Sequence, residues 1–323
     1  MPLRHCLLAL SVAVVWGLNF VAISASLEHF PPMFLVALRF AVVAIPTVLF
    51  VPAPGVPLRW LLGYGCGFGI VQFLFLFWGM AVGMPTGLAS LVLQSSAPFT
   101  VLLGATVLRE RISARQLAGI LVGVGGLAVV GWYRAETASV VPFLLTVAGA
   151  FGWAVGNICG RLAKPSSPVR LMLWMCVVPP LPMFALAFVV EGPTRIGVSL
   201  STLGAPGAWA ALLGLAYTVL IAGVLGSGAW TWLLARHPAG VVAPFSMLAP
   251  VVGMTAAWLV LRETVAAWEL LGGLLIVGGV LLGCVGRQGT GTRLPRVAPP
   301  GAPEPSEARV AGNGRLVNPR PPG

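Results

Sequence analysis

The chain has 323 residues, of which 58% are hydrophobic and only 8% are charged, and its mean hydropathy is +0.96. Soluble domains carry about 25% charged residues, so this composition excludes a water-soluble globule. The 19 basic residues outnumber the 8 acidic ones and give a net charge of +11. The placement of these bases decides whether the charge serves a nucleic acid or a membrane.

Apolar runs long enough to cross a bilayer recur along the chain. They predict ten membrane-spanning helices near residues 6–26, 33–51, 61–81, 86–107, 117–133, 140–161, 170–190, 208–234, 241–261 and 268–286. The first run follows Arg4 and could be a signal peptide. Its length of about 20 residues favours a retained helix instead. The predicted fold class is therefore an all-α polytopic membrane protein.

The composition changes after the tenth run. Residues 288–323 are rich in Pro, Gly and Arg, and this composition predicts a disordered tail. The five cysteines are isolated within apolar runs. The sequence contains no Cys/His cluster, so we expect no metal site and no cofactor.

The basic residues predict the orientation of the helices in the membrane. With the N-terminus in the cytoplasm, 15 of the 19 bases lie on the inside, and only Arg134, Arg195 and Arg262 lie outside. We therefore expect a multi-pass protein with both termini cytoplasmic, and a lipid bilayer rather than nucleic acid as its partner. Arg39 falls within a predicted span, so topology does not explain it.

An internal repeat divides the chain into two halves. The tripeptide Leu108-Arg109-Glu110 closes the fourth span, and Leu261-Arg262-Glu263 closes the ninth, 153 residues later. We assign residues 1–136 and 137–287 to two five-helix repeats. An odd number of spans in each half inverts the second repeat in the membrane, an architecture typical of secondary transporters.

Several motifs carry a family resemblance. They are Val15-Trp16-Gly17-Leu18-Asn19-Phe20, Leu38-Arg39-Phe40, Leu108-Arg109-Glu110-Arg111 and Gln116-Leu117-Ala118-Gly119. These motifs resemble the EamA family of the drug/metabolite transporter superfamily, over about residues 5–287. Within that family, the stretches from Gly83 to Gln94 and from Gly152 to Asn157 are most similar to the O-acetylserine/cysteine exporter type.

The resemblance implies an exporter of amino-acid metabolites in the bacterial inner membrane, with ten helices around a central cavity. One difference concerns the substrate. The exporter type carries Gln-Ala-Gln where this chain has Gln94-Ser95-Ser96. The second amide of that motif is therefore missing here.

Polar side chains within spans are candidate substrate-binding residues, because an apolar bilayer penalises them. Arg39 lies about six residues into the second span, roughly 9 Å from its outer end at 1.5 Å per residue. Its guanidinium could bind a carboxylate through two hydrogen bonds. Alternatively, it could extend toward the membrane surface or pair with backbone carbonyls.

Two tryptophan–amide pairs are further candidates. Trp16 and Asn19 share one helix face, and Trp153 and Asn157 share a face of the sixth span. These pairs could line a cavity, or could instead form hydrogen bonds between helices. Gln72, which lies in the middle of the third span, is also a candidate.

The fourth and ninth spans carry matched interruptions. Pro98 and Pro250 occupy corresponding positions in the two halves, and Gln94 precedes Pro98 by one turn. Paired breaks of this kind indicate a binding site, because a kinked helix leaves carbonyl groups free. We therefore predict Gln94 as a substrate-binding residue and the two prolines as gating or kink residues. The matched residues Glu110 and Glu263 lie at membrane edges, where a structural turn or an ion pair is expected.

These features predict a transporter that exports small amino-acid-like metabolites by alternating access. The alternative is a broad-specificity drug or other metabolite efflux carrier of the same fold. An enzyme is disfavoured, because the sequence contains no HExxH, no GxSxG and no paired intramembrane Asp, and no catalytic residue is assigned. The expected partners are a small-molecule substrate and lipid; a monomer and a homodimer both remain open.

Overall fold

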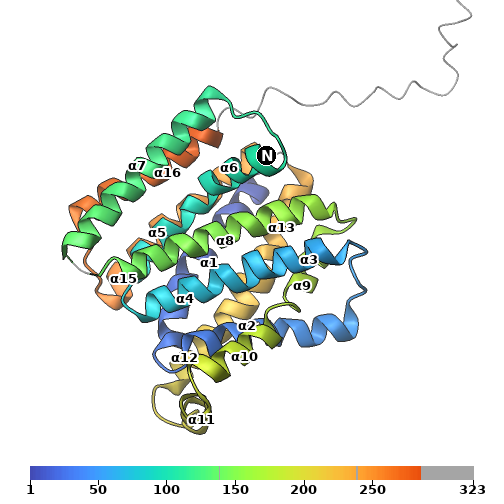
Figure 1. The fold of residues 1–323 in the computed structure, drawn as a ribbon, viewed down its shortest axis with the longest axis vertical. Helices are drawn as coiled ribbons and strands as arrows, with labels where there is room; N and C mark the ends of the chain where they lie inside the picture. Colours follow the sequence, from blue (N-terminus) through green and yellow to red (C-terminus); the bar gives the residue numbers. More distant parts are fainter. Residues whose placement is uncertain (138, 238, 285–323) are drawn as a thin grey trace, which may run out of the picture. The chain divides into compact units, whose positions relative to one another are not determined.

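The computed structural model describes residues 1–137, 139–237 and 239–284, and the regular structure within them is helical (Figure 1). The first half contains α1 (Leu3–Leu27), α2 (Pro32–Phe50), α3 (Leu58–Tyr64), η1 (Gly65–Gln72), α4 (Phe73–Ala81), α5 (Thr86–Val92), η2 (Leu93–Ser95), α6 (Ser96–Val107) and α7 (Ala114–Thr137). The second half contains α8 (Val141–Ala163), α9 (Pro168–Met175), α10 (Pro180–Val190), α11 (Pro193–Ser201), α12 (Ala208–Ala216), η3 (Tyr217–Gly226), α13 (Ser227–Arg236), α14 (Ala239–Ser246), α15 (Leu248–Leu261) and α16 (Ala267–Cys284). The predicted tail, residues 288–323, lies outside the described residues.

The helices match the predicted spans to within a few residues. Among the described residues, nine helical segments are long and apolar enough to cross a membrane, and one shorter apolar helix covers Ala267–Gly283. A multi-pass membrane protein is therefore confirmed, whereas the count of ten spans stays a prediction. The connector between the seventh and eighth spans contains the short helix α11, which the apolar runs did not predict.

Five of the described spans are interrupted, and in the seventh span α9 ends at Met175 and α10 begins at Pro180. The third and eighth spans contain the π-helical segments η1 and η3, and the fourth contains the 3₁₀ turn η2. In the ninth span, α14 and α15 meet at Met247. Pro98 follows η2 and cannot donate a hydrogen bond to the carbonyl of Gln94, and Pro250 lies equally close to the second break. The sequence thus predicts the proline breaks, but it did not predict the π-helical turns.

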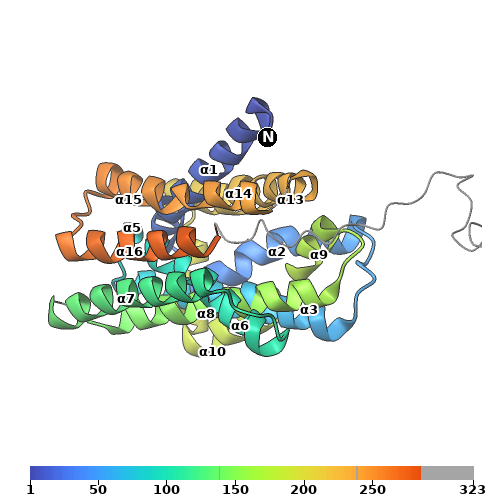
Figure 2. The same ribbon diagram turned by 90° about the horizontal axis from the view of Figure 1, so that it is seen from above.

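The packing of the helices repeats between the halves. Helix α1 packs against α12, η3 and α15, and α8, its counterpart, packs against η1 and α6. Helices α7 and α16, which end the two halves, lie side by side in Figures 1 and 2. Exchanging the halves therefore preserves these main helix contacts. This arrangement is what two related five-helix repeats would produce, although the inversion itself stays a prediction.

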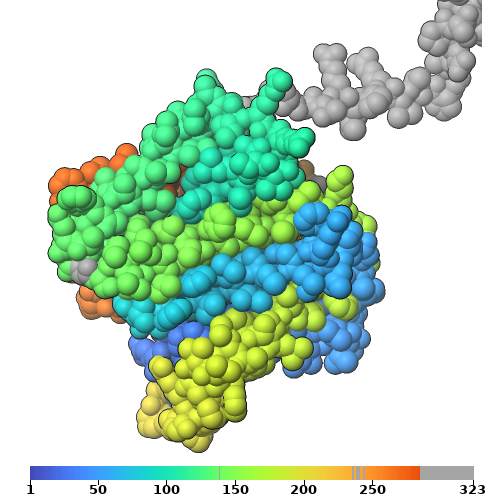
Figure 3. All heavy atoms as spheres, viewed as in Figure 1, coloured from blue at the N-terminus to red at the C-terminus, as the bar shows by residue number. Residues whose placement is uncertain are grey.

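Helix α8 and η1 approach each other very closely. A Cβ atom added to Gly67 would lie 2.7 Å from the backbone nitrogen of Gly156. Small residues permit this approach between membrane helices. Figure 3 shows the neighbouring helices α3, α4 and α8 packed along one face of the molecule. Buried side chains such as Phe77, Leu35 and Ile23 form the core.

Contacts between connectors join segments that the predicted topology places on the same side of the membrane. The Glu191 carboxylate accepts hydrogen bonds of 2.7 and 2.9 Å from two backbone N–H groups in the first turn of α2. The Glu263 carboxylate does the same at the start of α5, with distances of 2.8 and 2.9 Å. At the opposite end, the Trp174 indole donates to the carbonyl of Val51 at 3.1 Å. Glu263 therefore has the structural role expected of it, because it satisfies N–H groups that the helix leaves unpaired.

Candidate functional site

One arginine lies deep inside the helical part of the protein. Arg39, on α2, is only 8% exposed. Its guanidinium carbon lies 3.8 Å from the centre of the Phe73 ring, 5.0 Å from that of Phe40 and 6.0 Å from that of Phe77. Its Nη1 atom is buried, and no described residue provides a hydrogen-bond partner for it. Aromatic faces attract a cation but do not neutralise it, so Arg39 is a buried positive charge without an anion in the described part of the chain.

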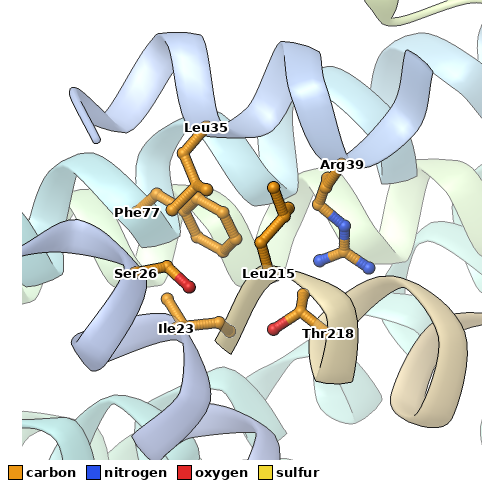
Figure 4. A pocket seen from close by; sticks show the side chains of 7 residues that line it. All are labelled: Ile23, Ser26, Leu35, Arg39, Phe77, Leu215 and Thr218. Atoms are coloured by element: carbon orange, nitrogen blue, oxygen red, sulfur yellow. The ribbon is translucent and has the colours of Figure 1, made fainter. Parts of the chain in front are cut away.

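A small enclosed cavity borders the guanidinium. Its lining side chains are Ile23, Ser26, Leu35, Arg39, Phe77, Leu215 and Thr218. Figure 4 shows the guanidinium pointing from α2 toward the helix that carries Thr218. The space between these side chains is too narrow for a water molecule. The Oγ1 atom of Thr218 is also buried without a partner among the described residues. Polar atoms with unused hydrogen-bonding capacity therefore border a closed space.

Helix α1 presents Trp16 and Asn19 on the face that also carries Ile23. The Trp16 indole donates a hydrogen bond of 3.2 Å to the carbonyl of Ala222 in η3, and its ring lies 5.1 Å from that of Trp230. The Oδ1 atom of Asn19 is buried and has no partner within the described residues. Arg39 and the Trp16 face of α1 thus both lie against the segment formed by α12 and η3.

The second tryptophan–amide pair lies across the molecule on α8. Trp153 packs edge-on against Phe68 at 5.9 Å, and Phe68 packs against Phe73 at 5.7 Å. A continuous chain of aromatic rings therefore leads from Trp153 to the ring beneath the Arg39 guanidinium. The Asn157 amide donates a hydrogen bond of 3.1 Å to the hydroxyl of Thr100. A hydrogen bond between helices was the alternative to a cavity-lining role for this residue.

The two glutamine candidates differ in their surroundings. Gln72 ends η1 and is buried, and its Oε1 atom has no partner among the described residues. Gln94 lies in η2, where its Nε2 atom is 3.5 Å from the sulfur of Met247. Because Met247 is the residue between α14 and α15, this contact joins the breaks of the fourth and ninth spans. Pro98 and Pro250 are both buried, and each is the third residue of the helix that follows its break.

Sequence reasoning missed two buried hydroxyl groups. Thr218, in η3, and Ser95, in η2, each carry a buried oxygen without a partner in the described structure. A serine or threonine in a helix usually bonds a carbonyl of its own helix. The sequence shows that a hydroxyl is present, whereas only the neighbouring helices determine whether it has a partner.

No group of three or more His, Cys, Asp or Glu side chains is arranged to hold a metal ion within residues 1–137, 139–237 and 239–284. The polar atoms described above are instead dispersed over α1, α2, η1, η2 and η3. They can donate to or accept from a small organic molecule, and the rings of Phe73 and Trp16 can contact its apolar part.

Comparisons with known proteins give a family match and several relatives. The sequence profile of the EamA-like transporter family matches residues 3–132 and 141–283. A protein of Salmonella typhimurium named "Probable amino-acid metabolite efflux pump" is 42% identical over 285 residues, which cover 86% of this chain and 94% of the relative. A protein of Escherichia coli with the same name is 40% identical, covering 88% of this chain and 96% of the relative.

Two more distant similarities extend this comparison. A "Probable terminal-alkyne amino-acid exporter" of Streptantibioticus cattleyicolor is 29% identical over 87% of this chain and 94% of its own length. A solved structure, titled "Crystal structure of protein", has a TM-score of 0.55 at 22% identity and covers 88% of this chain and 99% of its own. That structure is similar in fold alone.

Proposed function

Because this chain belongs to the EamA-like transporter family, we propose that it exports small zwitterionic metabolites of the cysteine and O-acetylserine class by alternating access. The relatives named as amino-acid metabolite efflux pumps support the amino-acid part of this proposal. In this proposal the protein lies in the bacterial inner membrane and has both termini in the cytoplasm.

The buried guanidinium of Arg39, whose Nη1 atom has no hydrogen-bond partner among the described residues, is the observation that carries the proposal. A buried charge is unfavourable unless an opposite charge and hydrogen bonds compensate for it. A substrate carboxylate would supply both, because its two oxygens match the fork of the guanidinium. Arg39 is therefore proposed to bind the carboxylate of the metabolite.

The remaining parts of a zwitterion have proposed partners nearby in the fold. An ammonium group donates three hydrogen bonds and needs oxygen acceptors. Asn19 and Gln72 each carry a buried acceptor oxygen without a partner in the described structure. The rings of Phe73 and Phe77 would contact the side chain of the metabolite. This set of groups suits a small amino acid with a weakly polar side chain.

Alternating access would require the space around Arg39 to open. The cavity has no room for water, so we interpret this arrangement as a closed state. The helix interruptions η1, η2 and η3 and the break at Met247 lie in the middle of spans, where a change of helix geometry can alter the packing. The repeated helix packing supports two five-helix repeats, residues 1–136 and 137–287, whose relative movement would expose the site to each side in turn.

A broad-specificity efflux carrier is the alternative, and one observation favours it. The rings of Phe40, Phe73 and Phe77 surround the Arg39 guanidinium, and aromatic surfaces of this kind accept diverse apolar compounds. Cationic drugs would meet the positive charge of Arg39, which opposes their binding. The two functions are therefore distinguishable by substrate charge.

The test is uptake into inside-out membrane vesicles, where an exporter concentrates its substrate. We expect the parent to accumulate labelled cysteine or O-acetylserine, and Arg39→Lys to reduce uptake by about tenfold or more, because a charged hydrogen-bonding pair contributes about 1.5–3 kcal/mol. The matched control is Arg59→Lys. The Arg59 guanidinium also lies over an aromatic ring, Trp60, at 4.9 Å, but is exposed. Vesicles that transport cationic dyes but neither amino acid would overturn the proposal.

A further inference from the structure

A second pocket lies at the membrane end where α7 finishes and α16 begins, apart from the Arg39 cavity. Its volume is about 260 Å³, and its polar lining consists of Tyr133, Arg134, Thr137, Thr264 and Glu269. A water molecule occupies about 30 Å³, so the pocket has room for roughly nine waters or for a small amino acid. We call it the outer pocket, because the predicted topology places this end of the helices outside the cytoplasm.

Opposite charges face each other within the outer pocket. The Arg134 and Glu269 side chains are only 12% and 6% exposed, and Nη1 of Arg134 lies 3.8 Å from Oε1 of Glu269. A close ion pair has a separation of about 2.7–2.9 Å. This pair is therefore about 1 Å longer than a good charge-assisted hydrogen bond.

Both groups retain unused hydrogen-bonding capacity. The Nη2 atom of Arg134 donates to the carbonyl of Gly83 at 3.3 Å, while its Nε atom is buried without a partner among the described residues. The Oε2 atom of Glu269 accepts from the backbone N–H of Ala266 at 3.1 Å. These backbone contacts hold the two side chains in place. The Nη1 donor and the Oε1 acceptor, which the long ion pair joins, remain for a ligand.

We propose that the outer pocket binds the zwitterionic amino-acid group of an exported metabolite on the extracytoplasmic side. The ligand carboxylate accepts from the Arg134 guanidinium, and its ammonium group donates to the Glu269 carboxylate. The hydroxyl groups of Tyr133 and Thr264 line the remaining space. The substrate class rests on the proposed function, whereas the site itself rests on the paired charges and the volume of the pocket.

The ion pair at the opposite end of the helices has different properties. Arg161 and Glu110 contact each other closely through two pairs of atoms, and their side chains are 40% and 45% exposed. An exposed pair in direct contact has water as an alternative partner and contributes little. This pair is therefore a matched control for charge removal.

The experiment is protection of a cysteine from labelling in right-side-out vesicles, which does not depend on transport. Thr264→Cys is introduced into the full chain after its five native cysteines are replaced, and a membrane-impermeant thiol reagent is applied outside. We expect external S-methylcysteine, a zwitterion, to slow the labelling. At ten times its half-protecting concentration, the rate should fall about elevenfold. N-acetyl-S-methylcysteine lacks the ammonium group, and S-methylcysteine methyl ester lacks the carboxylate, so neither should protect.

Charge-removing variants test the roles of Arg134 and Glu269 in ligand binding. Glu269→Gln and Arg134→Gln should each abolish protection by the zwitterion, whereas Glu110→Gln should leave it unchanged. The proposal would be overturned if labelling were the same with and without S-methylcysteine, or if the two analogues protected as well as S-methylcysteine does. These comparisons need no charge variant, so misfolding of a variant does not obscure the result. Arg39→Gln separates the two proposals, because it should abolish transport while leaving protection intact.

Discussion

The contact between α7 and α16 allows a sharp prediction about packing. At Gly126, an added Cβ atom would lie 2.5 Å from the carbonyl oxygen of Gly272 and 2.9 Å from the backbone nitrogen of Ile276. At the adjacent Gly125, nothing lies within 4 Å of the same position. Substituting alanine for each glycine therefore adds the same methyl group to the same helix in opposite surroundings.

The magnitude follows from these distances. An ordinary van der Waals contact begins near 3.4 Å, so Gly126→Ala must move α7 and α16 apart by about 0.9 Å. Such overpacking costs about 1–3 kcal/mol. Gly125→Ala meets no obstacle and gains up to ~1 kcal/mol, because alanine favours a helix interior over glycine. The two variants should therefore differ by roughly 2–4 kcal/mol in free energy of unfolding.

Thermal unfolding in detergent, followed by circular dichroism, measures this difference. At about 2.1 cal/mol/K per residue, the unfolding entropy of a chain of this size is about 0.7 kcal/mol/K, so we expect Gly126→Ala to melt roughly 3–6 °C below Gly125→Ala. Transport should fall with Gly126→Ala, since the contact between the last helices of the two halves would be altered. If Gly126→Ala melts at or above Gly125→Ala, the close packing of α7 on α16 is wrong.

Three further predictions concern the ends of the helices. Glu263→Gln should lower stability by about 1–3 kcal/mol, because one of the two backbone N–H groups at the start of α5 loses its carboxylate acceptor; the exposed Glu28→Gln is the control, and equal melting of both would contradict the capping role. Burial raises the pKa of the Glu191 carboxyl above its ordinary 4.5, although two backbone hydrogen bonds oppose the rise. The stabilising contribution of the protonated Glu191 is therefore present at low pH and lost as the pH rises through the folded pKa. Since Gln does not titrate, the melting temperature of Glu191→Gln should rise relative to that of the parent as the pH is raised above 4.5. A difference in melting temperature that stays constant with pH would refute this. Ala114→Cys should react with an impermeant thiol reagent only from the cytoplasmic side and Ala205→Cys only from outside, and the reverse pattern would overturn the predicted orientation.

Hydropathy and local chemistry were sufficient to predict most of the fold. The length of each apolar run predicted the spans, because a helix must satisfy its own backbone in lipid. Pro98 and Pro250 predicted the interruptions in two spans, because a proline lacks the N–H that continues a helix. The motifs around Trp16 and Arg39 identified the family. All of these properties depend on residues near one another in the chain.

Tertiary structure decided which polar groups have partners, because those partners come from helices far apart in the sequence. From the sequence, Asn157 and Asn19 were equivalent candidates, yet Asn157 bonds Thr100 and the Oδ1 of Asn19 has no described partner. The π-helical turns and the outer pocket, where Arg134 meets Glu269, also arise from packing between distant segments. The sequence alone determined that a charge, Arg39, lies within a span; the packing of α2 against aromatic rings determined that this charge is buried without an anion among the described residues.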